Sequence, residues 1–153
     1  MTTGAFLATY ADDDESSPIK RAVAIRERLM CQHVPSPPNN INTSRTEEEE
    51  RIKEELAGQV VSNREFVTAI TSSELCATCH EEIINPLGFG LEDFNAVGLF
   101  RNEDSNGLSI DSSGILYGVT HINDGESADF NGANGVSTLL ADNLVTESCF
   151  SEN

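Results

Sequence analysis

The chain has 153 residues, of which 38% are hydrophobic, and this is enough apolar content for one folded domain spanning residues 1–153. It carries 9 basic and 26 acidic side chains, for a formal net charge of −17. A surface this acidic repels nucleic acid and favours either a protein partner with a basic docking surface or a salty medium that screens the self-repulsion. An acidic surface that serves solubility alone is an equal alternative to a docking role. The sequence contains no apolar run long enough to span a membrane, so a membrane-spanning protein is excluded as well.

The first strong helical signal follows an acidic run that ends at Ser16. Ser17 is a candidate helix cap, Pro18 suits a first turn, and apolar residues recur at helical spacing as far as Met30. Four of the nine basic residues of the chain lie in this helix: Lys20, Arg21, Arg26 and Arg28. In so acidic a protein, we expect them to pair with groups of the protein itself.

Prolines end this helix, and the segment 31–38 is expected to be an extended strap. Ser44 and Glu47 are typical of a capping box for a second helix, whose narrow apolar stripe predicts a surface position. Asn63 is a candidate cap for a short third helix that leads towards residue 76.

The pentapeptide 76–80 carries the strongest chemical signal in the chain, because it reads Cys76-Ala77-Thr78-Cys79-His80. Two thiols three positions apart lie on one side of a helical turn, where both can add to one porphyrin edge. The adjacent imidazole of His80 is then available as the proximal ligand of the iron. A zinc site needs a second pair of ligands and a redox dithiol needs a βαβ setting, and the sequence indicates neither. The motif therefore predicts covalently attached haem c.

After His80, the sequence 85–88 is expected to break the haem helix. The densest apolar stretch of the chain comes next and is interpreted as the wall of the haem pocket; it includes Leu87, Phe89, Leu91, Phe94, Val97, Leu99 and Phe100. Turn signals at residues 106–107 and 113–114 favour a small hairpin, and residues 118–135 are expected to form a loop. A terminal helix over 136–144 follows, and no internal repeat is apparent.

The second axial ligand of the iron is the least determined part of the site. No methionine follows His80, and Met30 is expected to fill the core. His121, in a glycine-rich loop, is the favoured sixth ligand, and His33, in the strap, is the alternative. A neighbouring subunit could also donate a histidine, which would link haem ligation to assembly.

Haem attachment to this motif implies export, so a periplasmic or extracellular location is expected. The first residues do not resemble a signal peptide, which favours a processed part of a longer precursor. In an oxidising compartment Cys31 and Cys149 can form a disulfide, and two buried free thiols are the alternative.

Several segments together resemble the planctomycete-type cytochrome c domains, a family of secreted bacterial domains of unknown function. The resemblance rests on residues 17–21, 28–31, the strap, 79–80, 85–101 and 110–114. It implies a small, mainly α c-type cytochrome domain with long loops and a minor β-hairpin, in which Cys76, Cys79 and His80 hold haem c and the stretch from Pro86 to Arg101 shapes its pocket. Such domains usually lie inside a longer polypeptide, so a fragment of a larger secreted protein is also expected.

Electron transfer by a single covalent haem is the function that these residues favour, with a redox protein as partner. A haem-dependent, peroxidase-like enzyme is the alternative, and it needs a distal acid or base that the sequence does not display. A haem-bearing structural subunit of an extracellular assembly, either a homo-oligomer or an assembly with other chains, is the third class.

Overall fold

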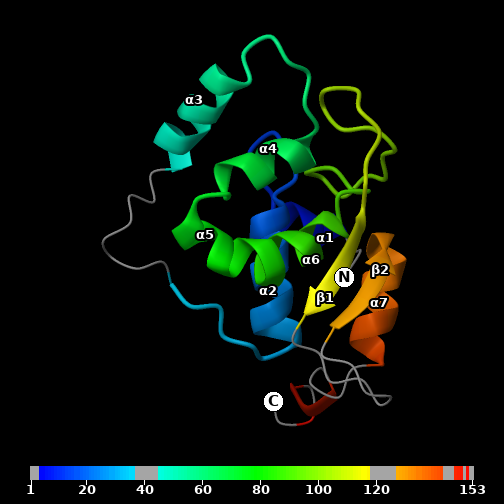
Figure 1. The fold of residues 1–153 in the computed structure, drawn as a ribbon. Coiled ribbons are helices and arrows are strands. Elements are labelled where there is room, and N and C mark those ends of the chain that lie inside the picture. The colour runs from blue at the N-terminus through cyan, green and yellow to red at the C-terminus, as the bar shows by residue number, and fades with distance from the viewer. Residues whose placement is uncertain (1–3, 37–44, 118–126, 143–146, 150, 152–153) are drawn as a thin grey trace.

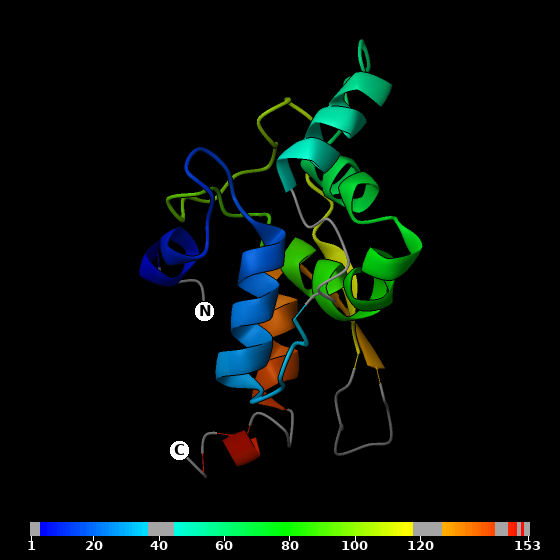
Figure 2. The ribbon, with the colours of Figure 1, turned by 90° about the vertical axis from the view of Figure 1, so that its left-hand side faces the viewer.

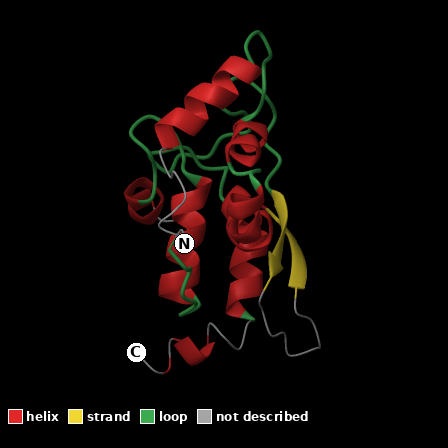
Figure 3. Ribbon diagram, turned by 60° about the vertical axis from the view of Figure 1, so that its left-hand side comes forward, coloured by secondary structure: helices red, strands yellow, loops and turns green. Residues whose placement is uncertain are grey.

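The computed structural model describes residues 4–36, 45–117, 127–142, 147–149 and 151. Its helices are α1 (Gly4–Thr9), α2 (Pro18–Leu29), α3 (Arg45–Glu55), α4 (Asn63–Ile70), α5 (Glu74–Cys79), the π-helix η1 (His80–Ile84), α6 (Asn85–Phe89) and α7 (Gly132–Ala141). Strands β1 (Ser113–Tyr117) and β2 (Ser127–Asn131) form an antiparallel pair. Figure 3 shows this pair at one side of a body made of helices, which agrees with the mainly α expectation.

The hydrophobic core lies where α2, η1, α6, β1 and α7 meet (Figures 1 and 2). Its largest wholly buried apolar side chains are Leu7, Ile25, Met30, Leu87, Leu91, Leu116 and Val136. Met30 therefore fills the core, as the sequence predicted. Helix α3 lies at the outer edge of the body in both views, and Ile52 is its buried side chain, so the expected surface helix is confirmed.

Helices α2 and α6 cross at very short distance, because a glycine stands at the crossing point. A Cβ atom on Gly88 would come within 2.2 Å of the carbonyl oxygen of Pro18. Any side chain here would separate the two helices, since close-packed interiors do not yield by a whole methyl group. Gly88 thus determines how closely α6 packs against α2.

Two arginines of α2 are buried and bind backbone carbonyl groups of distant segments. Arg21 is wholly inaccessible and donates to the carbonyls of Leu7, Leu91, Phe94 and Asn95 at 3.3, 2.9, 2.8 and 2.7 Å. Desolvation lowers the pKa of its guanidinium, and the nearby Glu92 carboxylate opposes this shift. The expected internal pairing of the basic residues is therefore confirmed for Arg21, but carbonyl groups are its main partners.

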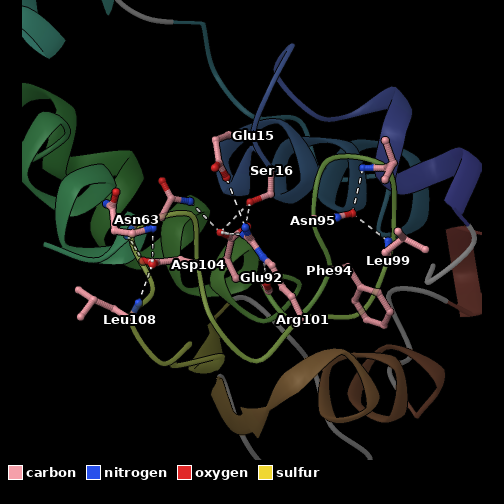
Figure 4. Close-up of polar contacts among 12 residues, drawn as sticks. Glu15, Ser16, Asn63, Glu92, Phe94, Asn95, Leu99, Arg101, Asp104 and Leu108 are labelled. Carbon is pink, nitrogen blue, oxygen red and sulfur yellow. Dashed lines mark hydrogen bonds and ion pairs between the residues drawn. The ribbon is translucent and has the colours of Figure 1, made fainter. Parts of the chain in front are cut away.

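Residues 94–109 form two turns of the same kind, nine residues apart. This repeat was not identified from the sequence. The side chains of Asn95 and Asp104 each accept hydrogen bonds from the backbone N–H groups two and four residues later (Figure 4). Each turn then contains a glycine with positive φ, 80° at Gly98 and 74° at Gly107. The short polar side chain and the glycine together allow the tight reversal, as in other Asx turns.

A buried carboxylate joins these turns to α2 and α4. Oε2 of Glu92 accepts hydrogen bonds from Ser16, Asn63 and Arg101 at 2.9, 2.7 and 3.1 Å (Figure 4). Burial raises the pKa of Glu92, whereas the hydrogen bonds and the two nearby arginines act in the opposite direction. Because these three partners come from three different segments, Glu92 holds the loop region against the helical body.

The observed hairpin differs from the expected one. Ser113 and Gly114 begin β1 rather than forming a turn, and β1 pairs with β2, which lies inside the stretch that was expected to be loop. Pairing runs from Ser113 opposite Asn131 to Tyr117 opposite Ser127. Leu116 and Phe130, on the inner face, are buried and supply the apolar contact that the pair makes with α6 and α7.

The disulfide expected between Cys31 and Cys149 is present and links residues 118 positions apart in the sequence. Cys31 comes directly after Met30, the C-terminal cap of α2, and has a φ of 50°, a left-handed conformation that ends the helix. The bond therefore connects the end of α2 to the C-terminal segment. Within the described residues, no helix is both long and apolar enough to cross a membrane.

Candidate functional site

The two thiols of the CxxCH motif lie on α5, one helical turn apart. Cys76 and Cys79 are both partly buried and both free, and Cys79 also packs against the hydrophobic core. The helix starts after Ser73, and Thr78 points to solvent with its hydroxyl bonded to the carbonyl of Glu74. Helical spacing thus puts the two sulfur atoms on the same side of the turn.

Directly after Cys79 the chain widens into η1, a single π-helical turn that begins at His80. The N–H of Asn85 donates to the carbonyl of His80, five residues back rather than four. Pro86 follows, and a proline has no N–H and clashes with the carbonyl four residues before it, so a wider turn accommodates it. The expectation that residues 85–88 break the helix was wrong, because the helical course continues through η1 into α6.

The ring of His80 is oriented by a chain of hydrogen bonds that reaches α4. Nδ1 of His80 lies 3.0 Å from Oδ1 of Asn85. The amide nitrogen of Asn85 donates to Oγ1 of Thr71 at 2.8 Å, and this hydroxyl donates to the carbonyl of Val67 at 2.7 Å. Asn85 and Thr71 are both buried, with 5% and 7% of their surface exposed. The imidazole is therefore held at Nδ1 by a fixed partner.

The second buried arginine of α2 supports η1 from the other side. Nε of Arg26 donates to the carbonyl of Ile83 at 2.7 Å, and its two terminal nitrogens donate to Gln32 and to the carbonyl of Tyr117. Burial lowers the pKa of Arg26 to about 10, so the guanidinium is still charged at neutral pH. One side chain thus joins α2, η1, the strap and β1 around the motif.

The residues predicted to line a haem pocket occupy several environments. Leu87 is wholly buried in the core, Phe89 lies under the guanidinium of Arg64 at 4.5 Å, and Pro86 is partly exposed. Phe94 packs edge-on against Phe100 at 5.9 Å between ring centroids. Their assignment to a haem pocket stays a prediction.

The far end of the same apolar stretch lies on the surface. Val97, Leu99 and Phe100 are 63%, 64% and 66% exposed. They belong to the first of the two repeated turns, which carries them away from the core.

The two candidate sixth ligands fall in different parts of the chain. His33 lies in the strap between Cys31 and Ser36, and its side chain is exposed. His121 lies outside the described residues. Both assignments stay predictions.

The donor set fits a covalently held haem. Two free thiols stand one turn apart, and a fixed imidazole follows them, which is the set that two thioether bonds and one axial ligand require. Across the described ranges, no three side chains among histidine, cysteine, aspartate and glutamate converge to hold a bare metal ion. A cavity of about 480 Å³ lies between α2, α3 and α4, with Ile19, Phe66 and Ile70 in its wall, and the motif residues do not line it.

The comparisons with known proteins agree with the sequence at the level of the family. Residues 1–104, which include the whole CxxCH motif, match the family PSCyt3, described as a protein of unknown function (DUF1588). No curated protein and no solved structure matches the chain. The match covers about two thirds of the 153 residues and contains α1 to α6 with the first of the repeated turns. The chain therefore belongs to the PSCyt3 family, a planctomycete cytochrome-type domain of unknown function.

Proposed function

We propose that the protein is a monohaem c-type cytochrome, which transfers electrons through a haem held covalently by Cys76 and Cys79. The observation that carries this proposal is the pair of free thiols on one turn of α5, followed at once by an imidazole oriented through Nδ1. A dithiol redox site has no use for a fixed histidine at this position. Membership of a cytochrome-type family supports the same reading.

In this proposal each motif residue has one role. The thiols of Cys76 and Cys79 each add across a vinyl group, so that a sulfur–carbon bond forms and the thiol hydrogen passes to the other vinyl carbon. Nε2 of His80 binds the iron as proximal ligand. When bound, the haem supplies a one-electron Fe(III)/Fe(II) couple, which takes an electron from a reduced partner and passes it to an oxidised one.

The partner and the location follow from the same chemistry. Haem attachment takes place outside the cytoplasmic membrane, so the protein is periplasmic or extracellular. The net charge of −17 favours a redox partner with a basic docking surface, and encounter would then slow as salt rises.

The test is whether haem stays on the chain after denaturation. Protein exported by a bacterium with haem-attachment machinery should keep its haem through acid–acetone extraction and give the pyridine haemochrome spectrum of haem c. The double variant Cys76→Ala/Cys79→Ala should lose it. Thr78→Ala, at the exposed position between the cysteines, is the matched control and should retain it. Haem that extracts freely from the natural sequence would refute the proposal.

For the sixth position we propose His121, with His33 as the alternative. A second imidazole gives a low-spin iron, so His121→Ala should produce a high-spin spectrum or iron that binds external ligands, while His33→Ala stays low-spin. The opposite result reverses the assignment. If neither variant changes the spectrum, a residue of another subunit or Met30 holds the iron, and Met30 would first have to leave the core in which it is 1% exposed.

A further inference from the structure

The hydrogen-bond chain from His80 to α4 has a fixed direction, because its last member can only accept. The carbonyl oxygen of Val67 has no proton, so the hydroxyl of Thr71 must give its single proton to it at 2.7 Å. The next nearest partner of this hydroxyl, the carbonyl of Thr68 at 3.3 Å, also only accepts. Towards Asn85, the oxygen of Thr71 is therefore an acceptor.

The position of the Thr71 hydroxyl proton determines the positions of the protons on Asn85 and His80. Because the hydroxyl oxygen of Thr71 accepts, the group of Asn85 that lies 2.8 Å from it must be the donor, which is the NH2 group. The amide oxygen of Asn85 then faces His80. That oxygen only accepts, so Nδ1 of His80, 3.0 Å away, must carry a proton. A neutral imidazole has one N–H, and Nε2 is then left with a free lone pair.

We propose that Asn85, oriented by Thr71, is the positioning residue that holds His80 as the Nδ1–H tautomer, presents Nε2 to the iron and sets the balance between oxidised and reduced haem. The consequence for haem rests on the proposed function, whereas the tautomer does not. Asn85 holds His80 at two points, because its backbone N–H also binds the carbonyl of His80 across the π-turn.

The π-turn is what makes this double contact possible. In an α-helix, residue 84 would donate to the carbonyl of His80, but η1 brings the N–H of Asn85 there instead. Asn85 and Thr71 are nearly inaccessible, so water does not compete for these bonds. The widened turn therefore has a role at the site in addition to accommodating Pro86.

An acceptor at Nδ1 makes the opposite nitrogen a stronger donor, and a stronger donor favours Fe(III). Loss of the acceptor should therefore favour the reduced haem. Outer partners of a metal ligand typically change metal binding by roughly tenfold or more. We expect a change of about tenfold in the ratio of reduced to oxidised haem at a given potential, or about 59 mV for a one-electron couple.

A spectroscopic redox titration of the full holoprotein tests the proposal. Asn85→Leu removes the acceptor and should raise the midpoint potential by this amount. Thr71→Val leaves Asn85 without its orienting partner and should shift the potential in the same direction, while Thr71→Ser keeps the hydroxyl and should restore the natural value. Thr68→Val is the matched control, since Thr68 makes the same kind of bond, to the carbonyl of Arg64, away from the site.

The proposal is overturned if Asn85→Leu and Thr71→Val change the ratio by less than twofold relative to Thr68→Val. If Asn85→Leu does not fold, Thr71→Val decides on the same criterion. If the natural protein carries no covalent haem, the proposed function has failed, and the tautomer is tested on the same full chain. There, 15N-detected imidazole spectra in mildly alkaline buffer should show His80 protonated at Nδ1, and protonation at Nε2 would overturn the inference.

Discussion

Replacement of Arg21 by methionine tests whether buried arginines, rather than apolar packing alone, hold the fold together. Methionine keeps the length of the side chain and removes all of its donors. Of the four carbonyls that Arg21 binds, those of Leu7 and Leu91 are in buried hydrogen bonds, and the carbonyl of Leu91 also accepts from the backbone N–H of Phe94 at 3.2 Å. An orphaned buried carbonyl costs about 1 to 3 kcal/mol, and this cost applies to the carbonyl of Leu7, since that of Leu91 keeps the N–H of Phe94.

A second estimate comes from the ion pair. Arg21 lies 3.8 Å from the buried carboxylate of Glu92, which Arg101 also binds at 3.1 Å. Leaving a buried charge without any partner costs about 3 to 5 kcal/mol, and this is an upper bound here because Arg101 remains. The two estimates describe the same side chain and are not additive, so we expect a loss of about 3 kcal/mol. For a domain whose total stability is about 5 to 15 kcal/mol, this is a large fraction.

Urea unfolding followed by far-ultraviolet circular dichroism measures the loss, and Arg28→Met is the matched control on the same helix. Arg28 is exposed, and its described contact is with the ring of Tyr10 at 5.5 Å, which contributes about 0.5 to 1 kcal/mol. If Arg21→Met costs no more than Arg28→Met, the carbonyls are solvated or re-paired in the variant, and the reasoning from orphaned acceptors is wrong.

Three further predictions concern residues outside the CxxCH motif. Replacing both disulfide cysteines by alanine should lower the free energy of unfolding by about 4 to 5 kcal/mol, because a 118-residue loop is released; chemical denaturation measures this, and unreduced peptide mapping should show the link. Ser62→Ala should cost about 1 kcal/mol at pH 7. Hydrogen bonds from Ser62 hold the pKa of Glu65 below its usual value. Their contribution to stability is lost as the pH falls through the folded-state pKa of Glu65, so the difference in stability between the variant and the natural protein should shrink in acid. Gly98→Ala should lower the melting temperature more than Gly107→Ala, because both have positive φ but only the new Cβ at 98 would meet another segment, at 2.7 Å.

The sequence was most informative where a local rule decides the structure. Pro18 in the first turn starts α2, and the cysteines at 31 and 149 form the expected disulfide. The capping residue of α4 was misplaced by one position, since Ser62 and Glu65 form the capping box and Asn63 is the first helical residue. Such boundary errors are small because caps and prolines act within one turn.

The π-turn could not be predicted from either of the two sequence signals at this position, which are the proline and the helical periodicity. A proline inside a helical pattern usually predicts a break, and periodicity of 3.6 has no place for a partner five residues away. Asn85 was accordingly assigned to a helix break, although it contacts His80 through both backbone and side chain. An asparagine five residues after the histidine of the motif and directly before a proline is the signal that could have indicated the contact between Asn85 and His80.

The apolar stretch from 87 to 100 shows a different limit. Its first half is buried, but the turn at Asn95 directs Val97 and Leu99 to the surface. Hydrophobicity alone does not distinguish these halves, whereas the spacing of Asn95 and Gly98, repeated at Asp104 and Gly107, does indicate two tight turns. A repeat as short as nine residues is visible only when turn chemistry is compared along with residue type.

The site also depends on residues that no local pattern connects to it. Arg26 lies 50 positions or more before the motif, yet its guanidinium binds the carbonyl of Ile83 and so fixes the turn that presents His80. The basic residues of this helix were expected to pair with groups of the protein itself, without an indication of which groups these are. Burial excludes water from Arg26. Without water, its guanidinium binds whichever acceptors the surrounding segments supply, and here these include carbonyl groups. The motif therefore specifies the chemistry of the site, while Arg26 holds the turn in which His80 stands and Asn85 orients its imidazole.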